Sequence, residues 1–174
     1  LARMQHPRLV CDSTRPVSPR ALEGGRVAVR SYSVTTGMWI RGILEEDHGV
    51  DHQRITWVTF EEAHVAEFRD PPNVERAPPG RKPEEMLLAG QVDAAILGND
   101  LPSDPRFRAV IPNAAEAGPA WHKATGLIPI NHMFVATTAL ADSRPDLVRE
   151  TYDLIRRAKD MAPPAKGSDM RPIG

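Results

Sequence analysis

"RVAVRSYSVTTGMWIRGILEED", residues 26–47, contains a strand, a helix and the junction between them. Val27 and Val29 alternate with their neighbours, as the apolar residues of a half-buried strand do. From about residue 36 to residue 47 the apolar residues recur at intervals of three and four, which predicts an amphipathic helix that Gly49 ends. The apolar residues of that helix are Ile40, Ile43 and Leu44. This strand–loop–helix unit indicates an α/β fold.

The same alternation of strands and helices continues along the chain. It predicts a three-layer α/β lobe with a mostly parallel or mixed sheet. The expected strands are 8–11, 26–30, 55–60, 92–97, 107–111 and 131–137, with a brief pairing around Val74. The expected helices are one turn within 18–25, then 36–47, a short helix from Pro83, 114–125, and a long helix capped by Ser143.

The composition excludes several classes of protein. The 174 residues carry 22 Lys and Arg against 23 Asp and Glu, so no basic field exists to attract nucleic acid. No apolar run approaches the roughly 18 residues that a membrane span needs. Cys11 is the single cysteine, which rules out an intrachain disulfide and any CxxC motif. Phosphate-binding, dinucleotide-binding and serine-hydrolase signatures are also missing.

The ends of the chain differ from those of a complete domain. The first residue is Leu1 rather than Met, and the last stretch is "APPAKGSDMRPIG". We therefore expect both ends to be cut from a longer protein. The lack of a signal peptide says nothing about secretion in that case.

The loop between the first strand and helix of the opening stretch is unusually rich in hydroxyl groups. Its hydroxyl residues are Ser31, Tyr32, Ser33, Thr35 and Thr36. A helix start offers unpaired N–H groups and a positive dipole end, so added hydroxyls would form a cradle for a carboxylate, sulfonate or phosphate. Arg30 and Arg41 would add positive charge. The alternative is that Ser33 or Thr35 only caps the helix.

Two further stretches carry histidine in a chemically useful setting. "TFEEAHVAEFRD", residues 59–70, could bind a metal or orient an acid–base pair through Glu62 and His64, or could be only a solvated polar face. Its spacing fits no closed zinc site, and we expect no metal. In "GLIPINHMFVA", His132 beside Asn131 is the best candidate for a general acid, and a structural histidine is the alternative.

Ligands of α/β sheets sit beyond the carboxyl ends of the strands. Three stretches occupy that position in the predicted order of elements, namely 31–37, 61–64 and 98–100.

Four stretches together resemble the 4,5-dihydroxyphthalate decarboxylase-like family, which has the type II periplasmic-binding-protein fold. They are "GGRVAVRSYSVTTGMWIRGILEEDHGV", "DPPNVERAPPG", "LLAGQVDAAI" and "GLIPINHMFVA". The similarity runs from about residue 18 to residue 160. It implies a fragment of a two-lobe protein with the ligand between the lobes. Residues 1–25 would end the first lobe and form a hinge, 26–136 would be the second lobe, and 137–174 would return towards the first.

The resemblance also implies an activity, a bacterial decarboxylation of an aromatic dicarboxylate such as 4,5-dihydroxyphthalate, and a cytoplasmic location. An acid protonates the ring carbon as carbon dioxide leaves, and no organic cofactor is needed. On chemical grounds, His132 would be the acid, and Glu62 or His64 the base for the ring hydroxyl. The ligand would be held by Ser31, Tyr32, Ser33, Thr36, Arg41 and Asn131.

Two alternatives remain open. The same fold serves solute-binding proteins of ABC transporters, which hold a small organic anion in the periplasm and deliver it to a permease without an acid–base pair. A single lobe could also bind nothing by itself, because it cannot enclose a ligand.

Overall fold

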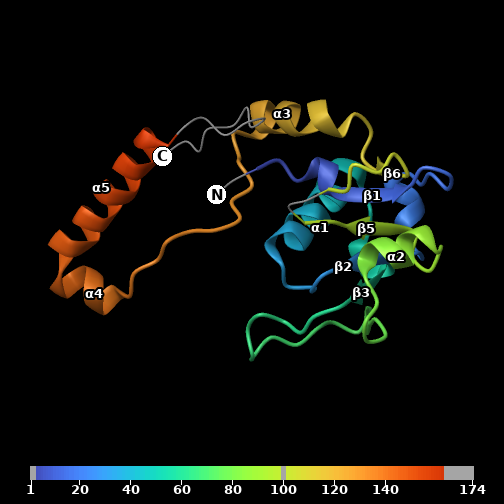
Figure 1. Cartoon of the computed structure of the whole chain (residues 1–174), viewed down its shortest axis with the longest axis horizontal. Helices are drawn as coiled ribbons and strands as arrows, with labels where there is room; N and C mark the ends of the chain where they lie inside the picture. The colour runs from blue at the N-terminus through green and yellow to red at the C-terminus, as the bar shows by residue number, and fades with distance from the viewer. Residues whose placement is uncertain (1–2, 99–100, 163–174) are drawn as a thin grey trace. The chain divides into compact units, whose positions relative to one another are not determined.

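A computed structural model describes residues 3–98 and 101–162 (Figure 1). The chain divides into two compact units. Residues 4–129 form the first, called the lobe below, and the described part of the second consists of Arg3 and residues 130–162, called the helical unit. Within the described residues, no helix combines the length and the apolar character needed to cross a bilayer.

A six-stranded mixed sheet is the centre of the lobe, with strand order β4-β3-β2-β5-β1-β6. Neighbours among β2, β3, β4 and β5 run parallel, whereas β1 is antiparallel to both β5 and β6. Val27 of β2 aligns with Trp57 of β3 and with Ala94 of β5. The strands are β1 (Leu9–Asp12), β2 (Arg26–Val29), β3 (Thr56–Thr59), β4 (Val74–Arg76), β5 (Ala94–Ile96) and β6 (Phe107–Ala109).

Helices cover both faces of this sheet. Val27 and Val29 of β2 belong to one buried cluster with Ile40 and Leu44, whereas Ala28 belongs to a second cluster that contains Met86 and Leu87. Successive strand residues point to opposite faces, so α1 and α2 lie on opposite sides of the sheet. The helices of the lobe are α1 (Thr35–His48), α2 (Pro83–Leu88) and α3 (Ala114–Thr125), with 3-10 turns η1 (His6–Arg8), η2 (Pro19–Leu22) and η3 (His52–Arg54). The predicted three-layer α/β lobe with a mixed sheet is confirmed.

The C-terminal end of α1 lies where the sequence predicted it. Gly49 takes a left-handed conformation with φ 63°, and its N–H donates to the Glu45 carbonyl, so the predicted stop is confirmed.

The helical unit contains two helices where the sequence predicted one. They are α4 (Thr138–Ser143) and α5 (Pro145–Met161). Ser143 does not cap the long helix, because it ends α4 and its hydroxyl donates to the Ala139 carbonyl. Pro145 disfavours a helical conformation at the residue before it, and Arg144 there has φ −138° and ψ 60°. The break between the helices follows from that restriction.

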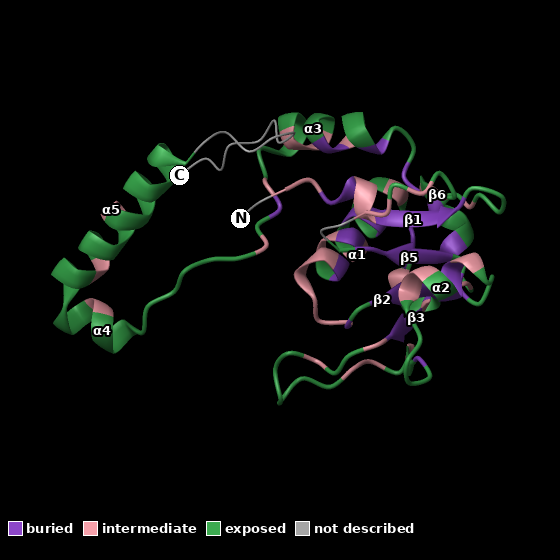
Figure 2. Ribbon diagram, viewed as in Figure 1, coloured by how far each residue is buried: buried purple, intermediate pink, exposed green. Residues whose placement is uncertain are grey.

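The strand predicted at 131–137 does not form. Ile130 makes an isolated bridge, and the seven residues that follow are extended without a ladder. Met133, Phe134 and Val135 are 73%, 88% and 88% exposed, and Figure 2 shows this segment as exposed. A strand needs a neighbour for its N–H and C=O groups, and none of the six described strands pairs with these residues.

Candidate anion-binding site

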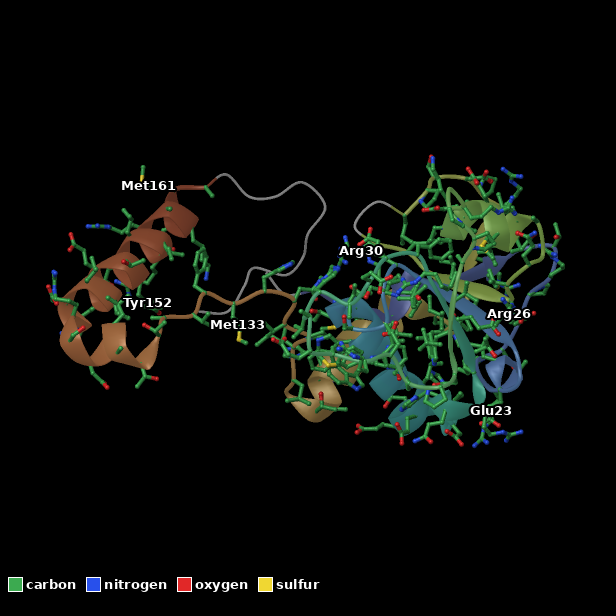
Figure 3. All side chains as sticks on the ribbon, turned by 90° about the horizontal axis from the view of Figure 1, so that it is seen from below. Glu23, Arg26, Arg30, Met133, Tyr152 and Met161 are labelled. Carbon is green, nitrogen blue, oxygen red and sulfur yellow. The ribbon has the colours of Figure 1, made fainter. Side chains whose placement is uncertain are left out.

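The loops that follow β2 and β3 meet at one edge of the sheet. The strands are parallel neighbours, so their carboxyl ends lie together. The N–H groups of Phe60 and Glu61 both donate to the Arg30 carbonyl, at 3.0 and 2.8 Å. Figure 3 labels Arg30 at this edge and Arg26 at the other end of β2. The predicted stretches 31–37 and 61–64 are therefore neighbours, whereas Asn99 and Asp100 of the third stretch lie outside the described residues.

Two serine hydroxyls link these loops. Ser31 is fully buried, and its Oγ lies 3.4 Å from the Oγ of Ser33. The Ser33 hydroxyl in turn accepts a hydrogen bond from the His64 N–H at 3.4 Å. Thr36 is half-buried in the first turn of α1. The structure thus places the predicted hydroxyl residues of the lobe around one helix start.

No hydroxyl side chain occupies the cap of this helix. The N-cap residue is Val34, which makes no side-chain cap hydrogen bond. The first intrahelical bond runs from the Met38 N–H to the Val34 carbonyl, at 3.0 Å. Neither Ser33 nor Thr35 takes the cap position that the alternative interpretation gave them, so capping does not explain the cluster of hydroxyl groups.

Arg41 brings a positive charge back to the start of α1. Its Nη1 donates to the Tyr32 carbonyl at 3.0 Å, and its guanidinium carbon lies 3.9 Å from the centre of the Tyr32 ring. The same carbon is 5.6 Å from the centre of the Trp57 ring. Burial lowers the pKa of Arg41 below its usual range, because desolvation penalises the charged form.

The half-buried Arg41 has no carboxylate partner in the described part of the chain. Ion pairs neutralise many other arginines, for example Arg26 with Glu75 at 2.8 Å. Among the described residues, Arg41 contacts only neutral groups, namely a carbonyl and two aromatic rings. A partly desolvated cation without a counter-ion among the described residues, bonded to the carbonyl of the residue between Ser31 and Ser33, is suited to hold an anionic group of a ligand.

His64 lies beside a carboxylate, but not beside the one that the sequence suggested. Its Nε2 is 3.7 Å from the carboxylate of Glu61 and 3.4 Å from Nη2 of Arg30. Glu62 instead pairs with Arg76 at 2.9 Å, with its side chain 89% exposed. Within residues 3–98 and 101–162, no three side chains of His, Cys, Asp or Glu gather as a metal site.

Asn131 and His132 belong to the helical unit rather than the lobe. They lie on the extended segment that precedes α4, where Asn131 is half-buried and His132 is exposed. Their predicted roles remain predictions.

Phe68 is a residue that the sequence did not single out. Its ring stacks on Tyr32, with ring centres 6.3 Å apart and an angle of 24° between the planes. The edge of Trp57 meets the same tyrosine at 6.2 Å. An aromatic residue in the polar stretch that follows β3 was the available signal, but its contact with Tyr32 depends on how the two loops meet.

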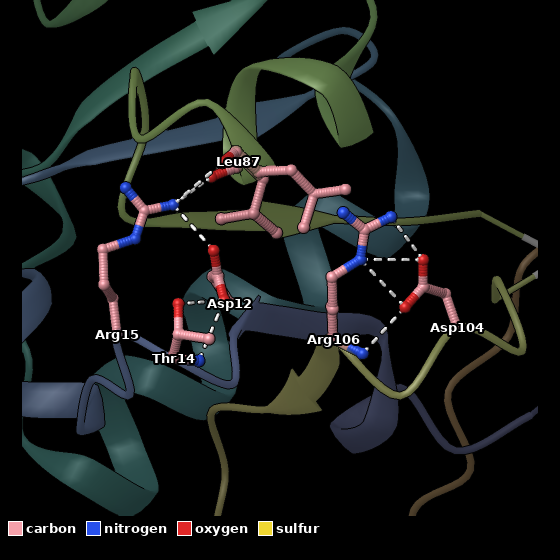
Figure 4. Close-up of polar contacts among 7 residues, drawn as sticks. Asp12, Thr14, Arg15, Leu87, Asp104 and Arg106 are labelled. Carbon is pink, nitrogen blue, oxygen red and sulfur yellow. Dashed lines mark hydrogen bonds and ion pairs between the residues drawn. The ribbon is translucent and has the colours of Figure 1, made fainter.

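The opposite edge of the sheet carries surface hollows. One of about 500 Å³ is lined by Arg26, Pro78, Arg81, Met86 and Gln91. A smaller one of about 60 Å³ lies beside Asp12 and Arg15. There Arg15 joins Asp12 to the Leu87 carbonyl, with both bonds at 2.8 Å (Figure 4). Arg15 is thus occupied by protein groups, and its contacts hold α2 and the end of β1 together.

The fold defines a three-layer α/β lobe in which two loops meet beyond the carboxyl ends of parallel strands, the usual ligand position in such sheets. The chain is 28% identical over 163 residues to a 4,5-dihydroxyphthalate decarboxylase of Comamonas testosteroni. This alignment covers 83% of this chain and 47% of that protein. It is 30% identical over 133 residues to a 4,5-dihydroxyphthalate decarboxylase of Pseudomonas putida, covering 69% of this chain and 51% of that protein. No family model matches.

These similarities confirm the predicted resemblance to the 4,5-dihydroxyphthalate decarboxylase-like family. The chain spans about half the length of the curated relatives that it matches.

Proposed function

We propose that this chain forms part of a cytoplasmic carboxy-lyase and holds one carboxylate of an aromatic dicarboxylate such as 4,5-dihydroxyphthalate. The observation that carries the proposal is Arg41, a half-buried cation without a carboxylate partner among the described residues, whose guanidinium donates to the carbonyl of Tyr32 in the hydroxyl-rich loop. The names of the two bacterial relatives support the substrate class and favour an enzyme over the solute-binding alternative.

The chemistry of the substrate sets what the enzyme must supply. In 4,5-dihydroxyphthalate each ring hydroxyl is para to a carboxylate. Loss of the hydroxyl proton to a base pushes electron density onto the carbon that bears this carboxylate. A general acid protonates that carbon, its bond to the carboxylate breaks, and carbon dioxide leaves. The other carboxylate keeps its charge throughout and needs a fixed cationic partner, which is the role we give to Arg41.

His64 is the better of the two proposed bases for the ring hydroxyl. Its ring lies between the Glu61 carboxylate and the Arg30 guanidinium, and its backbone is tied to Ser33, whereas Glu62 is engaged by Arg76. We expect Arg30, which also pairs with Glu61 at 3.4 Å, to turn away from Nε2 of His64 when that nitrogen accepts the hydroxyl proton. His132 remains our candidate for the acid that protonates the ring carbon, and Asn131 for a ligand contact.

We also propose that residues 137–162 return towards a first lobe in the longer protein. Several apolar side chains of the two helices are exposed within the described structure, which supports packing against another surface. They are Leu140, Leu147, Tyr152, Leu154 and Ile155.

The activity is tested by incubating the full-length protein with 4,5-dihydroxyphthalate and measuring protocatechuate and carbon dioxide. We expect turnover by the wild type and a large loss of turnover in His132→Ala. His48→Ala, at the end of α1, is the matched control and should retain activity. No turnover by the wild type would refute the proposed reaction, and unchanged turnover in His132→Ala would remove this residue as the acid.

A further inference from the structure

Phe68 presents a partly free aromatic ring next to the candidate anion-binding site. The ring stacks on Tyr32, and the residue is nevertheless 38% exposed. Tyr32 is also the residue that Arg41 contacts, through both its carbonyl and its ring. One tyrosine ring thus connects the Arg41 guanidinium to the exposed phenylalanine.

Both rings are held in place by specific contacts. Tyr32 is fixed by the edge of Trp57, which is fully buried, and by the bond from Arg41. The Phe68 N–H donates to the Val65 carbonyl at 3.0 Å, which closes a turn.

A side chain then ties this turn together from outside. Nη1 of Arg69 donates to the carbonyls of Ala66 and Phe68, at 2.7 and 3.0 Å. The same loop is bound to Ser33 through the His64 N–H. Phe68 is therefore positioned by the loop and by Tyr32 together.

We propose that Phe68 is a specificity-determining residue, whose exposed ring stacks on the aromatic ring of the ligand while Arg41 holds a carboxylate. This inference rests on the proposed function, because it uses the same anion-binding site. Offset stacking of two aromatic rings contributes about 0.5–1.5 kcal/mol beyond the burial of their area. A saturated ring that carries the same two carboxylates would keep the contact with Arg41 but lose this contribution.

The inference is tested by comparing two probes that match in charge and differ in aromaticity. These are phthalate and cis-cyclohexane-1,2-dicarboxylate, each titrated calorimetrically into the full chain. We expect the wild type to bind phthalate more tightly by roughly two- to tenfold, which is the stacking contribution expressed as a ratio of affinities. Phe68→Leu keeps an apolar side chain without a π face and should reduce this ratio to about one, whereas Phe68→Trp should preserve it.

Val65→Ala is the matched control. Val65 is 56% exposed in the same loop, and its replacement should leave the ratio unchanged. Equal binding of both probes by the wild type would overturn the role of Phe68 and leave the anion-binding site standing. A preference for phthalate that survives in Phe68→Leu would do the same. No binding of either probe would overturn the site and the stacking together.

Discussion

Replacing Arg41 with methionine separates the cost of this residue to the fold from its proposed use in binding. Methionine keeps a flexible apolar side chain against the rings of Tyr32 and Trp57. The fold loses one charge-assisted hydrogen bond of about 1.5–3 kcal/mol and a cation–π contact of about 0.5–2 kcal/mol. It also no longer buries an unpaired charge, which costs several kcal/mol. Because these contributions oppose one another, we expect the free energy of unfolding to change by less than about 1.5 kcal/mol.

Binding of an anionic ligand should respond very differently. Removal of one partner of a hydrogen-bonded charge pair at a desolvated site costs about 2–5 kcal/mol. Arg41 is only half-buried, so we take the lower end, which corresponds to an affinity about 30-fold weaker. Calorimetric titration with phthalate at low salt measures this loss, and urea denaturation of the same preparation measures the stability.

Arg26→Met is the control for this experiment. Arg26 lies at the other end of β2 and is already paired with Glu75, so phthalate affinity should be unchanged in this variant. Arg41→Lys keeps the charge but loses the planar fork, and we expect an intermediate affinity. A folded Arg41→Met protein that binds phthalate within threefold of the wild type would refute the assignment of Arg41 to the anion site.

Two glycines of α1 and one aspartate give further predictions. Gly42→Ala should raise the free energy of unfolding by about 0.5–1 kcal/mol, because a Cβ there meets nothing within 4 Å and alanine favours the helix. Gly37→Ala should lower the free energy of unfolding by about 1–3 kcal/mol, because its Cβ would lie only 3.3 Å from Val29 and 3.4 Å from Nη1 of Arg41. Equal urea midpoints for the Gly42→Ala and Gly37→Ala variants would contradict this reasoning. The pKa of Asp12 is lowered to about 2 by hydrogen bonds from Thr14 and an adjacent arginine, so its contribution to stability is present above its ordinary pKa of 3.8 and is lost as the pH falls through 2. Asp12→Asn should flatten the stability curve between pH 4 and pH 2, and parallel curves for the two proteins would show that this carboxylate is not responsible.

The local pattern of the sequence was enough to predict most elements of the lobe. Alternation of apolar residues marked β2, and the three- and four-residue spacing marked α1 to within one residue at each end. These periodicities depend only on backbone geometry, which is the same wherever the element packs. The same reasoning was wrong at residues 131–137, where an apolar composition typical of strands pairs with none of the described strands.

Sheet order could not be obtained in the same way. β1 lies between β5 and β6, and Leu9 aligns with Ile96, which is far from it in the sequence. Such pairings depend on which apolar surfaces meet after the helices have packed. A short buried strand such as "LVCD" carries no sequence pattern that selects one neighbouring strand over another.

For the candidate site, the sequence by itself determined the ingredients, namely a row of hydroxyl groups at a helix start and an arginine one turn into the helix. Only the tertiary structure decided how they are used. It left Arg41 without a carboxylate among the described residues, paired His64 with Glu61 rather than Glu62, and stacked Phe68 on Tyr32. The physical reason is that charge neutralisation and ring stacking act between loops that are about 30 residues apart in the chain, and these loops meet only because β2 and β3 pair in parallel.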